Sequence, residues 1–441
     1  MKAFIETIKN IYKIEELRSR IVYTLMILVI YRLGAHIVLP TVDPVLLDIK
    51  TEGVLGIIDI FSGGAFSRAS VFALGIMPYI SASIVIQLLG VAVPYFQRLQ
   101  KEGESGRRRI NQITRWLTIL ILLIQAPSYL SIIPANAWIP TINAGYRMAI
   151  SITILTAGTM FIMWLGERIT DKGIGNGISL IIMIGIIARF PFAIVTELTS
   201  RLEKAGGGLV MFLVEIVFLF LVFVVSILLV QGTRRIPVQY AKRIVGNKQY
   251  GGVRQYIPLK VNAAGVMPII FAQAIVMLPL SFARNVTANS ASGFIAAFAN
   301  PTGFWYNFTN AMLIVLFTYF YTAITINPTQ MAEDMKKNGG FIPGVKPGRR
   351  TAEFLDTIMS RITLPGSLFL AVVAIMPAFA MMAGISRGFA YFYGGTSLLI
   401  MVGVVLDTLQ QIESHLLMRH YDGLMKSGRI KGRAGGIASA M

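Results

Sequence analysis

The sequence predicts an all-α protein that crosses a membrane ten times. Hydrophobic residues make up 55% of its 441 residues, charged residues only 14%, and the mean hydropathy is +0.67. Soluble proteins usually carry about 25% charged residues. A helix that crosses a bilayer needs about 20 mainly apolar residues. Ten stretches approach that length, namely 21–40, 71–92, 116–134, 148–166, 178–198, 209–231, 264–283, 309–326, 364–383 and 396–412.

The distribution of Lys and Arg predicts the orientation of these stretches. Of the 40 Lys and Arg residues, 31 lie before the first stretch, in every second connection and after the last stretch. Basic residues are retained on the cytoplasmic side of a membrane. We therefore expect both ends to be cytoplasmic: an amphipathic segment at 1–20 and a tail at 413–441. No cleavable signal peptide is expected, because no small-residue cleavage site follows the first apolar stretch.

Two membrane segments carry polar or helix-breaking residues. The segment 53–67 contains Asp59 and the pair Gly63-Gly64, and its apolar part is too short to cross a bilayer. It is either an external loop or a short re-entrant helix, which is tolerated only where protein or water satisfies its backbone. The fifth stretch contains Arg189 and Pro191, and we expect it to be the least regular helix.

Two long connections on the predicted cytoplasmic side are rich in basic residues. Residues 232–263 carry seven Lys and Arg residues and no acid, and residues 327–363 carry six. Such loops either fix the topology of a transporter or dock an anionic partner, which is an RNA or an acidic protein surface. Their length favours docking, because topology alone does not require loops of this size.

The sequence gives no support for an enzyme. It has no cysteine and only three histidines, and it contains no P-loop, no HExxH helix and no GxSxG turn. We therefore expect no catalytic residues, no bound metal and no cofactor. A membrane protein of this kind is either a passive pathway or an ion-coupled secondary transporter. A transporter would place ionisable or cation-binding groups near mid-membrane.

Long motifs resemble the SecY family of protein-conducting channel subunits. They occur in matching order from the first apolar stretch to the last. Each is long and unusual in composition. The motifs are FSGGAFSRASVFALGIMPYISASIVIQLL (61–89), KEGESGRRRI (101–110), GTMFIMWLGERITDKGIGNGISLII (158–182), PLKVNAAGVMP (258–268), FIPGVKPGRRTAEFLD (341–356) and YGGTSLLI (393–400).

The resemblance implies an architecture of two pseudo-symmetric halves with five helices each. The halves are 21–200 and 201–412, and they open like a clamshell about a hinge between the fifth and sixth stretches. The segment 53–67 becomes the family's plug, a short re-entrant helix that closes the channel from outside. The implied plug residues are Ile57, Ile58, Asp59, Ile60, Phe61, Ser62, Gly63 and Gly64.

The resemblance also implies a constricted pore inside the single subunit. Six positions of an apolar pore ring are all isoleucine here: Ile76, Ile80, Ile178, Ile182, Ile270 and Ile400. Two of these pairs have i, i+4 spacing, so each pair shares one helix face. Stiff, β-branched side chains suit a dry collar that blocks ions and still deforms around a passing chain. The implied function is a passive pore for unfolded secretory polypeptides.

A lateral gate between the second, third, seventh and eighth stretches would release signal sequences and transmembrane segments into lipid. Gln87, Gln125 and Asn262 match polar positions along its seam. Judged by composition alone, each amide indicates ordinary hydrogen bonding between membrane helices, worth about 0.6–2 kcal/mol. With the resemblance, we expect these bonds to hold the gate shut until an apolar signal helix displaces them.

The two basic connections match the family's docking surface for the SecA motor ATPase and the ribosome. The residues concerned are Arg234, Arg235, Lys242, Arg243, Lys248, Arg254, Lys346, Arg349 and Arg350. Lys346 and the pair Asn247-Lys248 depart from the usual arginines, and lysine lacks the bidentate fork. Further implied partners are SecE-like and SecG-like subunits, signal peptides, nascent chains, SecDF, a YidC-type insertase and anionic lipids. The implied location is the plasma membrane.

Overall fold

The computed structural model describes residues 14–47, 49, 54–140, 143–203, 208–240, 243–245, 248–250, 254–273, 275–276 and 302–426. In the N-terminal part the helices are α2 (Glu15–Gly34), α3 (Val54–Phe61), α4 (Met77–Ala92), α5 (Pro94–Lys101), α6 (Glu104–Leu130), α7 (Ala144–Lys172) and α8 (Gly177–Glu203), with a short 3-10 turn η1 (Ala135–Ala137). The later helices are α9 (Gly208–Gln231), α12 (Phe304–Thr325), α13 (Pro328–Lys337), α14 (Arg349–Met382), α15 (Arg387–Ala390) and α16 (Gly395–Lys426).

The described helices match the predicted membrane spans. Nine of the ten apolar stretches coincide with α2, α4, α6, α7, α8, α9, α12, α14 and α16, and residues 267–273 begin a helix within the remaining stretch. Residues 277–283 of that stretch lie outside the described part. Within the described part of the chain, seven helices are each long and apolar enough to cross a membrane, and the pair α4 and α5, bent by 98°, could make an eighth.

Two helices differ from the expectation in detail. The helix of the second stretch begins at Met77 rather than at residue 71, because Gly75 has a positive φ of 55° and Pro78 occupies the first helical turn. The expectation that the fifth stretch forms the least regular helix was wrong, because the helix is not interrupted at Pro191. Helix α8 continues through Pro191 from Gly177 to Glu203, although proline removes one backbone hydrogen bond within a helix.

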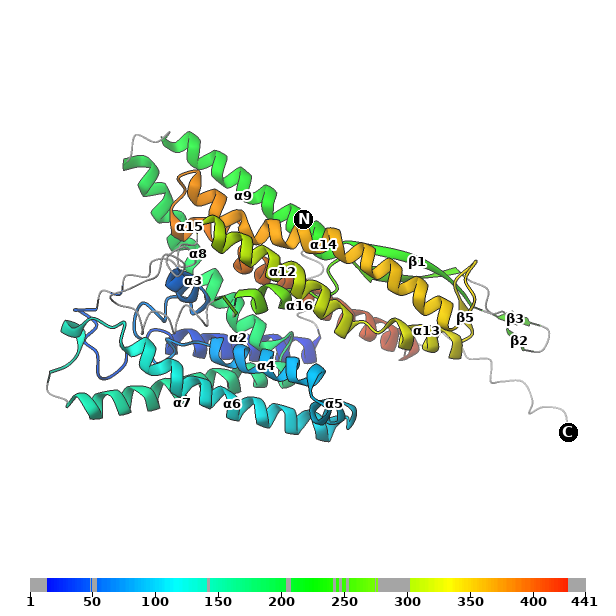
Figure 1. Ribbon diagram of the computed structural model, residues 1–441, viewed down its shortest axis with the longest axis horizontal. Helices are drawn as coiled ribbons and strands as arrows, with labels where there is room; N and C mark the ends of the chain where they lie inside the picture. Colours follow the sequence, from blue (N-terminus) through cyan, green and yellow to red (C-terminus); the bar gives the residue numbers. More distant parts are fainter. Residues whose placement is uncertain are drawn as a thin grey trace.

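The helices form two groups that meet along α8 and α16 (Figure 1). Helices α2, α4, α6 and α7 pack together, and α12, α13 and α14 form the second group with α9 beside them. Helix α8 contacts α2 and α7 on one side and α9, α15 and α16 on the other. The predicted boundary near residue 200 stays a prediction.

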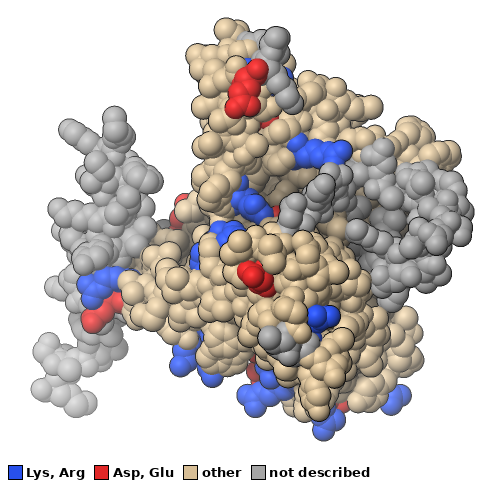
Figure 2. Space-filling model, turned by 90° about the vertical axis from the view of Figure 1, so that its left-hand side faces the viewer, with Lys and Arg blue, Asp and Glu red and all other residues tan. Residues whose placement is uncertain are grey.

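A small β-sheet, which the sequence analysis did not predict, lies at one end of the molecule (Figure 1). Strand β1 (Thr233–Tyr240) pairs antiparallel with β4 (Arg254–Lys260) and, at its last two residues, with β5 (Gly340–Phe341). Strands β2 (Arg243–Val245) and β3 (Lys248–Tyr250) form a separate hairpin. The opposite end is shown in Figure 2, where most of the described surface is neither acidic nor basic.

A buried ion-pair network joins the ends of α8 and α9 to the connection after α14. Arg201 donates to Glu197 Oε1 at 2.9 Å, to Glu215 Oε1 at 2.5 Å and to the Gly384 carbonyl at 3.0 Å. Glu197 also accepts the Ser386 N–H at 2.8 Å. Both carboxylates are nearly inaccessible, and a buried carboxylate is tolerated only when it is paired. The network therefore ties the predicted hinge to the second group of helices.

Candidate functional site

The predicted pore ring lies in the largest buried apolar cluster of the described chain. Ile76, Ile182 and Ile400 are buried members of this cluster, and Ile80, Ile178 and Ile270 pack against it. Ile76 precedes α4, and the other five come from α4, α8, α16 and the helical segment 267–273, which lie far apart in the sequence. The structure thus brings all six isoleucines into one region at the junction of the two helix groups.

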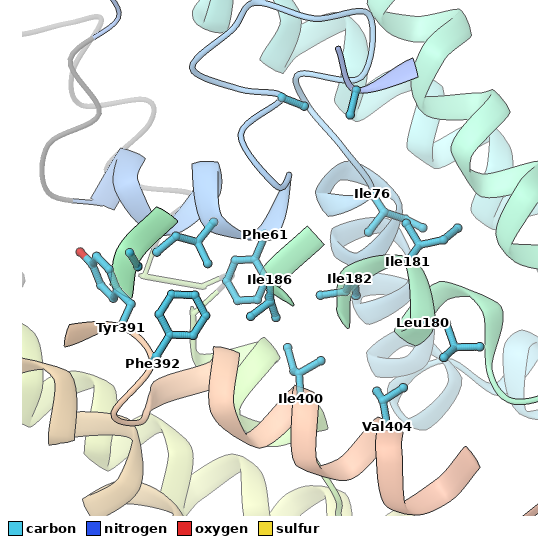
Figure 3. Packing of buried hydrophobic residues seen from close by; sticks show 14 of the residues in the cluster. Phe61, Ile76, Leu180, Ile181, Ile182, Ile186, Tyr391, Phe392, Ile400 and Val404 are labelled. Atoms are coloured by element: carbon cyan, nitrogen blue, oxygen red, sulfur yellow. The ribbon is translucent and has the colours of Figure 1, made fainter. Parts of the chain in front are cut away.

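Four of these isoleucines surround a small cavity together with the plug helix. Ile80, Ile182, Ile270 and Ile400 line it, and Phe61 at the end of α3 faces it. We call these four residues the isoleucine collar. Figure 3 shows Phe61 between Ile182 and Phe392, with Ile400 beside Ile182. The aromatic ring therefore lines one side of a space whose other walls are the four isoleucines together with Met77, Ser81 and Gln273.

The remaining two isoleucines lie at the margin of this arrangement. Ile178 packs close to Gly166 of α7, where a Cβ on the glycine would lie 3.0 Å from Ile178 Cγ1. Ile76 is 5% exposed and belongs to the buried cluster, just before α4 begins. Neither residue lines the cavity. The geometry therefore favours a collar of four isoleucines, with Ile76 and Ile178 packed next to it.

The predicted plug is a helix followed by a tight turn, and the alternative of an extended external loop is not observed for residues 54–67. Helix α3 packs against α8, and Phe61 is 7% exposed. Gly63 and Gly64 have positive φ angles of 64° and 84°, a conformation that favours glycine. The plug backbone approaches α8 so closely that a Cβ on Gly185 would lie 2.5 Å from the Phe61 carbonyl oxygen. The Ile57 side chain lies outside the described part.

Charged residues of two spans hold this turn. Asp59 is 4% exposed and forms an ion pair with Arg189 of α8. Arg189 also donates to Ser67 Oγ at 2.9 Å, and the Ser67 N–H donates to Asp59 Oδ1 at 2.8 Å. Arg32 of α2 donates to the Gly63 carbonyl at 2.8 Å. The turn is therefore fixed to both α2 and α8.

The three amides of the predicted gate seam differ in their described surroundings, and their role in holding the gate shut stays a prediction. Gln87 donates to Ser83, one turn earlier in the same helix, at 3.3 Å. Asn262 is 7% exposed, and its Oδ1 has no hydrogen-bond partner among the described residues. Gln125 is half-buried on α6. Intrahelical bonding satisfies Gln87 locally, so it does not need a partner across the seam.

Apolar packing closes this region instead. Ile84 of α4 belongs to one buried cluster with Ile269, Phe271, Ile314 and Phe317. These residues belong to the segment 267–273 and to α12, so the second, seventh and eighth spans meet there. Phe271 and Phe317 form an edge-to-face pair with ring centroids 5.8 Å apart. The contacts described between these three spans are therefore apolar and aromatic.

The predicted docking residues lie at the sheet end of the molecule. Arg234 and Arg235 on β1 are exposed, as are Lys346, Arg349 and Arg350 before and at the start of α14. Ile236, Val238, Leu259, Met335, Ile342, Leu355 and Met359 form a separate small core under this surface. Arg243, Lys248 and Arg254 are placed on strands by their backbone, and Lys242 and Asn247 lie outside the described part.

Several residues of the site were missed by the sequence analysis. Ile186 and Val404 belong to the buried cluster one helical turn beyond Ile182 and Ile400, so the i, i+4 spacing could have found them. Phe392 packs against Phe190 with ring centroids 4.9 Å apart and carries no comparable signal. The pairing of Asp59 with Arg189 was also missed, although both charges within apolar segments were noted.

The sequence matches a known protein family and curated members of it. A family model described as SecY matches residues 70–409. A relative from Aquifex aeolicus (strain VF5), named protein translocase subunit SecY, is 44% identical over 431 residues, which cover 96% of this chain and 99% of the relative. The expected resemblance is thereby confirmed.

Two solved structures share the fold. One is a SecY structure whose plug domain is described as stabilising the closed state of the translocation channel and maintaining a membrane seal. It matches with a TM-score of 0.64 and 18% sequence identity, and the match covers 94% of this chain and 95% of that one. Sec61 in the canine ribosome-channel complex has a TM-score of 0.60 and 16% identity at the same two coverages. The ten-span fold expected from the sequence is thus confirmed, and this multi-pass membrane protein belongs to the SecY family.

Proposed function

We propose that this chain is the pore-forming subunit of a protein-conducting channel. It moves unfolded secretory polypeptides across the plasma membrane and releases apolar segments sideways into lipid. The observation that carries this proposal is the isoleucine collar with Phe61 of the plug segment packed against it. An apolar collar of this kind excludes hydrated ions and binds no particular sequence, so a polypeptide of any composition can pass and leave.

An ion-coupled transporter is not supported. Such a protein places ionisable or cation-binding groups at a mid-membrane site, whereas four of the eight residues around the collar cavity are isoleucine and none of the eight is ionisable. Among the described residues, no group of three or more His, Cys, Asp or Glu side chains is arranged to hold a metal ion. The absence of recognisable catalytic motifs favours a channel subunit over an enzyme. Energy would therefore come from a partner.

The gate and the docking surface complete the proposal. The apolar seam between α4, the segment 267–273 and α12 would part to admit a signal helix, because apolar contacts exchange readily for lipid or for an apolar signal. The exposed basic residues around β1 and the start of α14 would bind a SecA-type motor or the ribosome in the cytoplasm. SecE-like and SecG-like subunits, SecDF and a YidC-type insertase would be further partners, and anionic lipids would surround the complex.

The first prediction concerns the polypeptide path. A photo-crosslinking residue at Ile80 or Ile270 should form adducts with a stalled secretory precursor in reconstituted vesicles. These adducts should require both the signal sequence and the energy-supplying partner, because only an engaged chain reaches the collar. The same probe at Ile150, which is 42% exposed on α7, should label lipid. If the collar positions label only lipid, the proposed pore is refuted.

The second prediction concerns the gate. Asn262→Leu replaces a buried amide whose oxygen lacks a partner, and relief of an unsatisfied polar group is worth about 1–3 kcal/mol. The closed seam should become more stable, so export of precursors with weakly apolar signals should fall while strong signals keep their efficiency. Ser226→Ala, which removes another unpartnered buried group in α9, serves as the control. Equal loss for weak and strong signals would contradict a gating role.

The third prediction concerns docking. Reversal of charge at Lys346, Arg349 and Arg350 to glutamate should weaken binding of a SecA-type motor and of ribosomes by about tenfold or more, because like charges facing each other cost several kcal/mol. The matched control reverses Arg107, Arg108 and Arg109, which are also exposed but lie near the start of α6. Binding measured by sedimentation at ordinary salt should separate the two variants. Equal affinities would argue against this surface.

A further inference from the structure

The plug segment carries a charge where apolar packing alone would suffice. Asp59 lies in the middle of the helix VLGIIDIF, and its side chain is only 6% exposed. Removing a carboxylate from water is costly unless it is paired and hydrogen-bonded. A plug that served only as an apolar stopper would gain from an aliphatic residue here, so the acid indicates a separate task.

The partner of Asp59 comes from a different part of the fold. Arg189 lies 130 residues away on α8 and has 29% of its side chain exposed. It pairs with Asp59 and also bonds Ser67 Oγ, so one guanidinium spans both ends of the plug turn. The Ser67 N–H closes the ring by donating to Asp59 Oδ1. We call Asp59, Ser67 and Arg189 the plug latch.

The contacts around the latch make it sensitive to movement of the plug. The plug turn lies directly on the α8 backbone at Gly185, and Arg32 holds the Gly63 carbonyl from α2. Moving the plug away from α8 therefore separates Asp59 from Arg189. Arg68 and Arg189 both approach Gly64, where a Cβ would lie 2.7 Å from Arg68 Nη2 and 2.9 Å from Arg189 Nε, and Arg32 bonds the neighbouring Gly63 carbonyl. Three positive charges therefore gather at this turn, where Asp59 is paired with Arg189. Loss of Asp59 would leave the repulsion among these charges uncompensated.

We propose that the Asp59–Arg189 ion pair is an electrostatic latch that sets how firmly the plug closes the channel, with Arg189 as the positioning residue. This inference rests on the proposed function and adds to it a charged element that isoleucine packing does not supply. Apolar contact seals the pore, and the ion pair determines the fraction of time for which that contact is made.

The test is a charge-swap series in the full chain, reconstituted with its partner subunits in vesicles. Asp59→Asn and Arg189→Gln should each raise the resting ion conductance about tenfold or more. A tenfold shift corresponds to about 1.4 kcal/mol, and loss of one partner of a buried ion pair usually costs more than that. The control variant is Arg147→Gln. It removes a charge from the start of α7, where Arg147 lies over the Trp138 ring, and it should leave the conductance unchanged.

Rescue separates a latch from a merely structural role. The single reversals Asp59→Arg and Arg189→Asp should be leaky, and the double variant should return toward the wild-type conductance, because the pair is restored with opposite polarity. A double variant as leaky as the single ones, or single variants as tight as the wild type, would overturn the latch. If precursor adducts at Ile270 still form in those vesicles, the latch alone has failed. If those adducts are absent in the wild type, the proposed function has failed.

Discussion

The contact between Phe61 and the isoleucine collar is the interaction on which the rest of the structure depends. Phe61 meets residues of four elements, α4, α8, the segment 267–273 and α16, at one small cavity, so parts of both helix groups come together there. Helix α8 lies at the centre of this arrangement, with the plug on one face and α16 on another. In such a contact each pair of atoms contributes little attraction, but the sum over many pairs is large. This suits the proposed seal, which must open and re-form.

Around this contact, buried ion pairs connect the helices to one another and to the plug turn. The Arg201 network ties α8 and α9 to the connection after α14. Arg32 and Arg189 tie the plug turn to α2 and α8. Buried ion pairs add little net stability compared with apolar packing, but breaking one of their partners is costly. Such pairs therefore define a preferred arrangement more than they strengthen it.

Much of the fold could be predicted from the sequence, and the exceptions have physical reasons. Hydropathy located the spans because a bilayer demands long apolar helices. The start of α4 was misplaced because hydropathy does not detect the turn at Gly75. The sheet was missed, although Ile236 and Val238 are buried between exposed neighbours in β1, an alternation with period two. Its pairing with β4 and β5 brings together distant segments, which periodicity cannot show.

The candidate site was predictable only in part. The resemblance to a family supplied the isoleucines and the plug, whereas composition alone left the segment 53–67 open between two forms. Asp59 and Arg189 were visible as charges in apolar segments, but nothing in their spacing of 130 residues indicates that they pair. The amides were expected to bond across the seam, yet Gln87 bonds within its own helix. Gln87 forms a hydrogen bond within its own helix because such a bond needs no partner from another helix.

Ion conductance of reconstituted vesicles shows whether the plug segment seals the collar, as we propose. A variant that lacks residues 57–65 loses Phe61 and with it the aromatic side of the cavity. We expect this variant to conduct ions in the absence of any precursor. Vesicles with the intact chain should show no such conductance under the same membrane potential. Equal conductance of the two proteins, with precursor export retained by both, would contradict this expectation.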